Sequence, residues 1–192
     1  MDKNNNKSTK SFRALVFTQF QGALNDNAYK TLLLVMAVSL VSSMEESKNW
    51  SSITMLIFTL PFLLFSMLGG SLADRFSKRN VIVYTKIWEI GAMAAAFLAL
   101  ATGNMWFCIC VLFFTGAQSA VFGPSKYGII PELVPEKRLS WANGIIELTT
   151  FAAIILGSVI GTLFLGFFKE NLQYSALVFI VLSVAGTITA CM

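Results

Sequence analysis

The charged run Gly70-Ser71-Leu72-Ala73-Asp74-Arg75-Phe76-Ser77-Lys78-Arg79 separates two long apolar segments, residues 53–68 and residues 81–101. Each segment, with its flanks, is long enough to cross the roughly 30 Å hydrocarbon core of a bilayer as a helix. The acid and the three bases between them are stable only in water or among lipid headgroups. The run is therefore predicted to be a turn between two membrane-spanning helices.

Composition indicates that the bilayer is the solvent of this chain. Hydrophobic residues make up 56%, charged residues 12%, and the mean hydropathy is +0.70. These values exclude an ordinary water-soluble fold of this size. The formal charge of +4 is spread over short loops and does not form a patch interleaved with aromatic residues, so a nucleic-acid partner is not predicted. With no histidine and three scattered cysteines, the sequence predicts neither a metal site nor a cofactor.

Apolar runs and their breakers predict six helices, at about residues 13–42, 51–73, 80–102, 104–130, 139–168 and 172–192. Residues 1–12 are predicted to be a disordered cytoplasmic tail, and residues 13–192 a single six-helix unit. Cations gather before the first predicted span, after the second and after the fourth: Lys3, Lys7, Lys10, Arg13, Arg75, Lys78, Arg79, Lys137 and Arg138. By the positive-inside rule the amino terminus is expected in the cytoplasm.

The charged run resembles the signature loop of the major facilitator superfamily of secondary transporters. The residues that match are Gly70, Leu72, Asp74, Arg75, Lys78 and Arg79, while Ser77 stands where that family prefers glycine. The resemblance implies an all-α membrane protein, in which six transmembrane helices form two three-helix inverted repeats and together make the amino-terminal half of a two-half transporter. A missing six-helix half would then complete the transport site. The alternative is a complete six-helix protein that pairs with itself.

The resemblance also implies a role for the loop. In the family the acid and the bases form a latch that holds the outward-facing state, and the matching positions here are Gly70, Asp74, Arg75, Lys78 and Arg79. The alternative is a basic loop that only sets membrane topology.

Asp26 is the first candidate for a transport site. It lies about 20 Å along a helix from Arg13, too deep for a short carboxylate to reach the interface. Polar residues recur around it at three- and four-residue spacing and are predicted to line a central cavity: Gln19, Gly22, Asp26, Tyr29 and Lys30. The alternative is an Asp26–Lys30 ion pair at i, i+4 that only neutralises itself.

Two further helices carry ionisable residues. Lys86 and Glu89 are interpreted as a structural pair, with Lys86 close enough to the cytoplasmic end to extend its amine to the interface. Asn143 and Glu147 share one face of their helix, with Glu147 about two turns inside the membrane, where a cavity role is one of two open interpretations. The GxxxG pattern of residues 157–161 predicts close helix packing without chemistry.

The helix predicted at 104–130 ends in a polar segment that begins at Gln118. Gly123 and Pro124 are expected to open or kink the helix and to free backbone carbonyls. Lys126 would then project near the inner mouth as an anion ligand, or alternatively extend to the headgroups.

Two segments show a narrower resemblance, to the bacterial lysophospholipid transporters. They are residues 21–28, and residues 122–133 followed by 139–144. The resemblance implies that Asp26, Asn27 and Lys126 belong to the transport pathway, and that lysophospholipids move inward across the bacterial inner membrane for reacylation. Several members of that family are fused to acyltransferase or synthetase domains.

Three functions follow for testing. The first is lysophospholipid transport, with Asp26, Asn27, Gln118, Lys126, Asn143 and Glu147 as the candidate site. The second is proton-coupled export of a small solute or drug through Asp26 or Glu147, although residues 139–168 lack the proline-bearing glycine pattern of drug–proton antiporters. The third is a membrane anchor for a fused acyltransferase. An enzyme is not predicted, because no nucleophile–base pair or phosphate-binding glycine loop is recognised.

Overall fold

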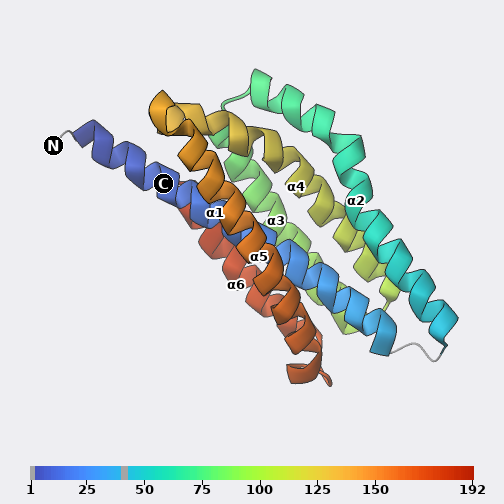
Figure 1. Ribbon diagram of the computed structural model, residues 1–192. Coiled ribbons are helices and arrows are strands. Elements are labelled where there is room, and N and C mark those ends of the chain that lie inside the picture. Colours follow the sequence, from blue (N-terminus) through green and yellow to red (C-terminus); the bar gives the residue numbers. More distant parts are fainter. Residues whose placement is uncertain (1–2, 40–42) are drawn as a thin grey trace.

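The computed structural model describes residues 3–39 and 43–192, and these form a bundle of long helices (Figure 1). The helices are α1 (Lys3–Ser39), α2 (Met44–Arg75), α3 (Lys78–Thr102), α4 (Met105–Leu133), α5 (Leu139–Phe167) and α6 (Gln173–Ala190), with a short 3-10 turn, η1 (Glu136–Arg138), before α5. Five of them, α2 to α6, are long and apolar enough to cross a membrane. The predicted all-helical membrane fold is confirmed.

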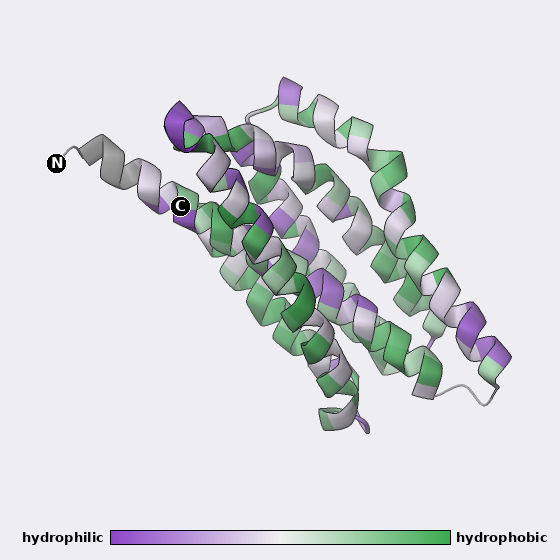
Figure 2. Ribbon diagram, viewed as in Figure 1, coloured by the Kyte–Doolittle hydropathy of each residue, from purple (hydrophilic) through white to green (hydrophobic). Residues whose placement is uncertain are grey.

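Helix α1 is long enough to cross a membrane but more polar than the other five. Its middle carries a run of buried polar side chains: Thr18, Gln19, Gln21, Asn25, Asp26 and Asn27. They are enclosed because α1 packs against α2, α4, α5 and α6. Figure 2 accordingly shows hydrophilic stretches within the otherwise hydrophobic body of the bundle. The polar side chains in the middle of α1 are thus buried among the other helices.

The helix contacts follow the pattern of two related triplets, α1–α3 and α4–α6. Helix α1 packs on α5, and its counterpart α4 packs on α2. Helix α3 packs on α4, and its counterpart α6 packs on α1, while the α1–α4 and α3–α6 contacts each map onto themselves. Exchanging the triplets therefore leaves the main contacts unchanged, as expected for two three-helix repeats.

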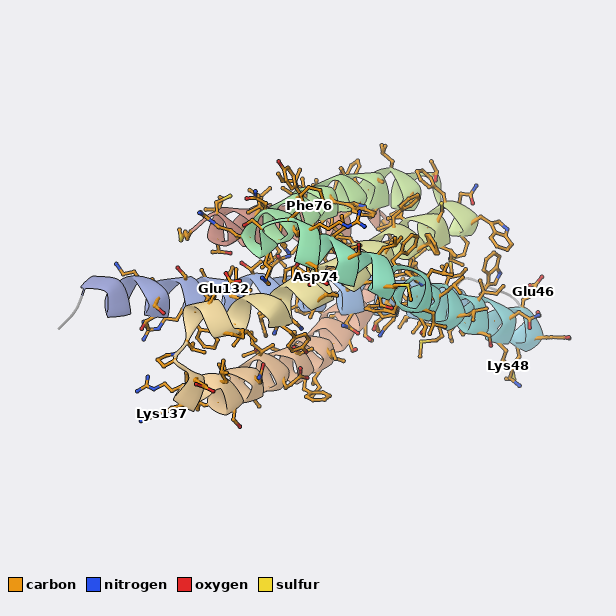
Figure 3. All side chains as sticks on the ribbon, turned by 90° about the horizontal axis from the view of Figure 1, so that it is seen from above. Glu46, Lys48, Asp74, Phe76, Glu132 and Lys137 are labelled. Carbon is orange, nitrogen blue, oxygen red and sulfur yellow. The ribbon has the colours of Figure 1, made fainter. Side chains whose placement is uncertain are left out.

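The charged turns lie at opposite ends of the bundle. Figure 3 shows Glu132 and Lys137 toward one end and Glu46 and Lys48 at the other. The start of α1 and the end of α6 lie toward the same side of the bundle (Figure 1), and the Arg79 guanidinium donates a hydrogen bond to the Cys191 carbonyl there. This arrangement is what an even number of antiparallel passes requires.

Two helix starts differ from the sequence prediction. Helix α1 begins at Lys3, so residues 3–12 of the expected disordered tail are helical, while residues 1–2 and 40–42 of the predicted elements lie outside the described residues. Residues 3–12 contain no proline or glycine to interrupt a helix. The segment also ends at Phe12, whose side chain is buried and so holds this part of α1 against the bundle. Helix α2 begins at Met44 and not near residue 51, because the Ser43 hydroxyl accepts a hydrogen bond from an amide of the first turn at 3.1 Å.

The expected opening of α4 at Gly123 and Pro124 is wrong. The helix is continuous from Met105 to Leu133, through Pro124 and Pro131. A proline removes one intrahelical hydrogen bond, and here neighbouring helices hold the segment in place. A Cβ on Gly69 of α2 would lie 2.9 Å from the Ala120 carbonyl oxygen, which shows how closely α2 approaches α4.

Two apolar cores bracket the polar middle of α1. One core contains Ala28, Leu32 and Leu33 of α1 with Phe179 of α6. The other contains Phe12 and Leu15 of α1 and residues of α3, α4 and α5, among them Ile82, Phe122, Ile130 and Ile146. The polar segment of α1 therefore lies between two packed layers, at the depth where a cavity opens.

Candidate functional site

A cavity of about 690 Å³ opens beside the polar middle of α1. It is bounded by residues of α1, α2, α3, α4 and α5. Four of the six predicted site residues line it: Asp26, Asn27, Gln118 and Lys126. Asn143 is exposed on α5 and is not part of the cavity wall, and Glu147 reaches the wall through a neighbour.

Asp26 is buried, with 4% of its surface exposed. The Ser119 hydroxyl of α4 donates a hydrogen bond to its Oδ2. Its Oδ1 is buried and has no hydrogen-bond partner among the described atoms. Because a buried carboxylate oxygen without a donor is costly, Oδ1 is the atom of this cavity most in need of a ligand donor or a proton.

The Lys30 amine does not pair with Asp26, so the self-neutralising Asp26–Lys30 pair is absent from the described residues. Lys30 Nζ instead donates to Asn27 Oδ1 at 2.7 Å and lies 4.7 Å from the centre of the Phe58 ring. The Asn27 amide nitrogen is held by the Ala23 carbonyl at 2.8 Å. The contacts of the Lys30 amine at the cavity wall are thus with neutral groups.

Lys126 also meets an aromatic ring. Its Nζ lies 4.4 Å from the centre of the Tyr127 ring, and only 8% of the residue is exposed. The side chain therefore lies in the cavity wall and does not extend to the headgroups. The Tyr127 hydroxyl donates to the Glu147 carboxylate, which is how Glu147 of α5 is linked to the site.

Lys86 and Glu89 of α3 form a buried ion pair, each 1% exposed. The expectation that Lys86 extends to the interface is wrong. Its amine also donates to Gln21 Oε1 at 2.5 Å, while Glu89 Oε1 accepts from Gln21, Asn25 and Ser183 at 2.8, 3.1 and 3.0 Å. The interpretation as a structural pair is supported, because these bonds join α1, α3 and α6.

The ion pair also borders the cavity, where Gly22 of α1 leaves it uncovered. A Cβ at Gly22 would lie 3.2 Å from Lys86 Nζ and 3.4 Å from Glu89 Oε2. Any larger side chain at Gly22 would therefore press on the pair.

The predicted polar stripe of α1 holds at four of its five positions. Gln19, Gly22, Asp26 and Lys30 line the cavity, but Tyr29 does not. Tyr29 is fully buried in the apolar core and donates its hydroxyl to the Cys108 carbonyl at 3.0 Å. Helical spacing alone assigned Tyr29 to the stripe, whereas its hydrogen bond to Cys108 of α4 directs the side chain away from the cavity.

The cavity wall also contains residues that sequence reasoning missed. Among them are the hydroxyl residues Thr18, Ser66, Ser119 and Thr150, together with the apolar residues Phe58, Phe62, Phe122 and Ile154. A hydroxyl such as that of Ser119 gives no signal in an apolar helix, because it can bond to its own backbone. Within residues 3–39 and 43–192, no three Cys, Asp or Glu side chains come together as a metal site.

The GxxxG pattern packs α5 on α1, as predicted. A Cβ on Gly157 would lie 2.6 Å from the Leu24 carbonyl oxygen, and one on Gly161 would overlap the Ala28 carbonyl oxygen. These contacts bring the two backbones together beside the cavity.

The loop between α2 and α3 is short, with only Phe76 and Ser77 outside the helices. Ser77 has a φ of −57°, so this position does not require the glycine that the family prefers. Lys78 donates to Glu132 of α4 at 2.9 Å. Asp74 is exposed at the end of α2, near Phe76 in Figure 3.

Comparison with known proteins agrees with this architecture. The family model described as Major Facilitator Superfamily matches residues 15–192. The lysophospholipid transporter LplT of Salmonella arizonae is 31% identical over 185 residues, which cover 95% of this chain and 42% of that protein. LplT of Photorhabdus laumondii is 33% identical over 173 residues, covering 88% and 39%, and LplT of Escherichia coli is 34% identical over 157 residues, covering 80% and 36%.

The chain spans about two-fifths of the length of the curated relatives that it matches. Its five apolar helices and its relatives make it a multi-pass membrane protein. Because the family model covers most of the chain and the helices pack as two related triplets, the chain belongs to the Major Facilitator Superfamily.

Proposed function

We propose that the full-length protein moves lysophospholipids inward across the bacterial inner membrane by alternating access. Similarity to proteins named lysophospholipid transporters supports this proposal. The observation on which the proposal chiefly rests is the central cavity, because its wall contains two lysine amines and several aromatic side chains. A ligand with a phosphate at one end and an acyl chain at the other matches this division of polarity.

In this proposal Lys126 binds the phosphate, and Lys30 provides a second amine on the wall of the same cavity. Both amines rest on aromatic rings, so neither is neutralised by a carboxylate within the described residues. Asp26 accepts a hydrogen bond from the headgroup through its unpartnered Oδ1, while Asn27 and Gln118 complete the polar part of the wall. The phenylalanines of the cavity wall contact the acyl chain.

Glu147 acts indirectly, by orienting the Tyr127 ring that supports Lys126. Asn143 has no role in the proposal, since its side chain is exposed away from the cavity wall.

The loop from Gly70 to Arg79 is proposed to be a latch at the cytoplasmic end. Lys78 and Arg79 already bind groups of α4 and of the carboxyl-terminal segment, Glu132 and the Cys191 carbonyl. Asp74 and Arg75 are exposed and available to a second six-helix half. We infer that such a half completes the protein, since this chain matches only part of its relatives' length.

We also propose that the amino terminus is cytoplasmic. The support is the distribution of Lys and Arg, which gather in the first turns of α1, at the end of α2 and the start of α3, and between α4 and α5.

The test is uptake of labelled lysophosphatidylethanolamine by spheroplasts that carry the full-length protein. Asp26→Asn and Lys126→Ala are expected to abolish most uptake at normal membrane abundance. Lys169→Ala, at an exposed position outside the cavity, is the matched control and is expected to behave as wild type. Wild-type protein that is present but inactive toward this lipid would contradict the proposed substrate.

The unpartnered Oδ1 of Asp26 favours one second candidate, proton-coupled export of a small solute. A buried carboxyl that forms no ion pair within the described residues is suited to bind and release a proton. In that case a protonophore would abolish transport in wild type, and the lipid would not be a substrate.

We infer that this segment acts as a transporter and holds no catalytic centre, in line with the names of its relatives. If the full-length protein carries a fused acyltransferase, Asp26→Asn is expected to leave acyl transfer intact while uptake is lost. Loss of neither activity would favour the membrane-anchor alternative.

A further inference from the structure

A second cavity, of about 660 Å³, lies away from the central one. It is open to the surface and is lined by the first turns of α1, the segment between α4 and α5, and the beginning of α5. This is the end of the bundle at which Figure 3 shows Lys137. None of the proposed transport residues lines it.

Two guanidinium groups line this cavity, those of Arg13 and Arg138. Among the described residues of its wall there is no aspartate or glutamate. Neither arginine has a carboxylate within ion-pair distance in the part of the chain whose side chains are described. Arginine pairs with phosphate through parallel hydrogen bonds, so two unpaired guanidiniums favour a phosphate ligand.

The remaining wall is mostly apolar and runs toward the middle of the membrane. On α1, Val16, Phe17 and Phe20 follow Arg13 at helical spacing, over a rise of about 10 Å. On α5, Trp141 and Ile145 follow Arg138 in the same direction. The cavity is therefore cationic at its outer end and apolar further in.

The aromatic residues at the outer end have the character of a membrane interface. The Trp141 ring lies 5.7 Å from the Phe12 ring, centre to centre, and 57% of Trp141 is exposed. Tryptophan concentrates at the level of the lipid headgroups, where its ring contacts the chains and its N–H contacts polar groups.

We propose that this cavity binds a diacyl phospholipid with a net negative headgroup, from the leaflet that faces Lys137. Arg13 and Arg138 hold its phosphate, and an acyl chain lies along Phe17 and Phe20. The lipid occupies a site separate from the transport cavity and is not the transported molecule. At its inner end the Gln19 amide donates to the Thr149 hydroxyl at 2.9 Å, so a wall residue of the central cavity is bonded to a wall residue of this one.

The test uses full-length protein in a mild detergent, with lipid retention measured by native mass spectrometry. Dioleoylphosphatidylglycerol is the probe, and dioleoylphosphatidylcholine is the zwitterionic comparison. Wild type is expected to bind phosphatidylglycerol more tightly. The Arg13→Gln/Arg138→Gln variant is expected to bind it about tenfold or more weakly, and Lys137→Gln, which removes a neighbouring charge outside the cavity, is expected to bind as wild type.

A third variant, Arg13→Lys/Arg138→Lys, keeps the charge and is expected to retain part of the affinity, which separates a specific effect from misfolding. Undiminished binding by the glutamine variant would overturn the proposal. An equal loss in Lys137→Gln would also overturn it, because a diffuse charge would then explain binding. Displacement of the lipid by millimolar inorganic phosphate would assign the site to a soluble anion, and equally tight, arginine-dependent binding of lysophosphatidylethanolamine would assign it to the transported lipid.

Discussion

The buried Lys86–Glu89 pair offers the sharpest test of how this bundle is held together. Glu89→Gln leaves an oxygen that still accepts from Gln21 and Asn25, but it turns an amide N–H₂ toward the Lys86 amine. Two donors then face each other at a position that is 1% exposed. Breaking one partner of a buried ion pair costs about 3–5 kcal/mol, because the other charge stays buried and unpaired.

Lys86→Met removes the cation and leaves the Glu89 carboxylate with its three neutral donors. We expect a cost near the lower end, about 3 kcal/mol. The double variant Lys86→Met/Glu89→Gln keeps an acceptor for those donors and buries no charge. It is expected to be less destabilised than either single variant.

The measurement is thermal unfolding of the full-length protein in detergent, followed with a thiol-reactive dye after every cysteine other than Cys108, including Cys110 and Cys191, is replaced by serine. Cys108, which is fully buried, then reports opening of this segment. For a protein more than twice the length of this chain, 1 kcal/mol corresponds to about 1 °C, so each single variant should lower the midpoint by roughly 3–5 °C. Lys169→Met is the exposed control. Single variants within 1 °C of wild type, or a double variant as unstable as the sum of the singles, would refute the reasoning.

Three other predictions concern packing, capping and the loop. Gly161→Ala adds a methyl group against the Ala28 carbonyl oxygen and is expected to cost about 1–3 kcal/mol; an unchanged unfolding midpoint would mean that α1 and α5 separate easily. Ser43→Ala removes the α2 cap and is expected to cost about 1 kcal/mol in the same assay, while no loss would show that the first turn does not depend on it. Lys78→Gln breaks the partly exposed bond to Glu132, so stability should change by less than about 1 kcal/mol. Its uptake rate should nevertheless fall if the loop is a latch, and normal uptake would contradict that role.

The sequence by itself determined the class of fold and most of its elements. In a bilayer the backbone N–H and C=O groups of a long apolar segment must hydrogen-bond within the protein, which makes the segment a helix. The hydropathy of the sequence identifies five such segments directly. Helix α3, expected at 80–102, runs from Lys78 to Thr102. The deep position of Asp26 pointed to a cavity for the same reason, because a polar group in hydrocarbon must face something polar.

Only the tertiary structure decided which partner each polar group takes. The i, i+4 spacing allows Lys30 to pair with Asp26. The Lys30 amine instead donates to Asn27 and lies over the ring of Phe58 of α2. Lys86 was expected at the interface, but Glu89 and groups of α1 hold it inside the bundle. Periodicity gives the face of a helix and the partners within reach on it, whereas the choice among them also depends on groups that other helices supply, such as Phe58 beside Lys30 and Gln21 beside Lys86.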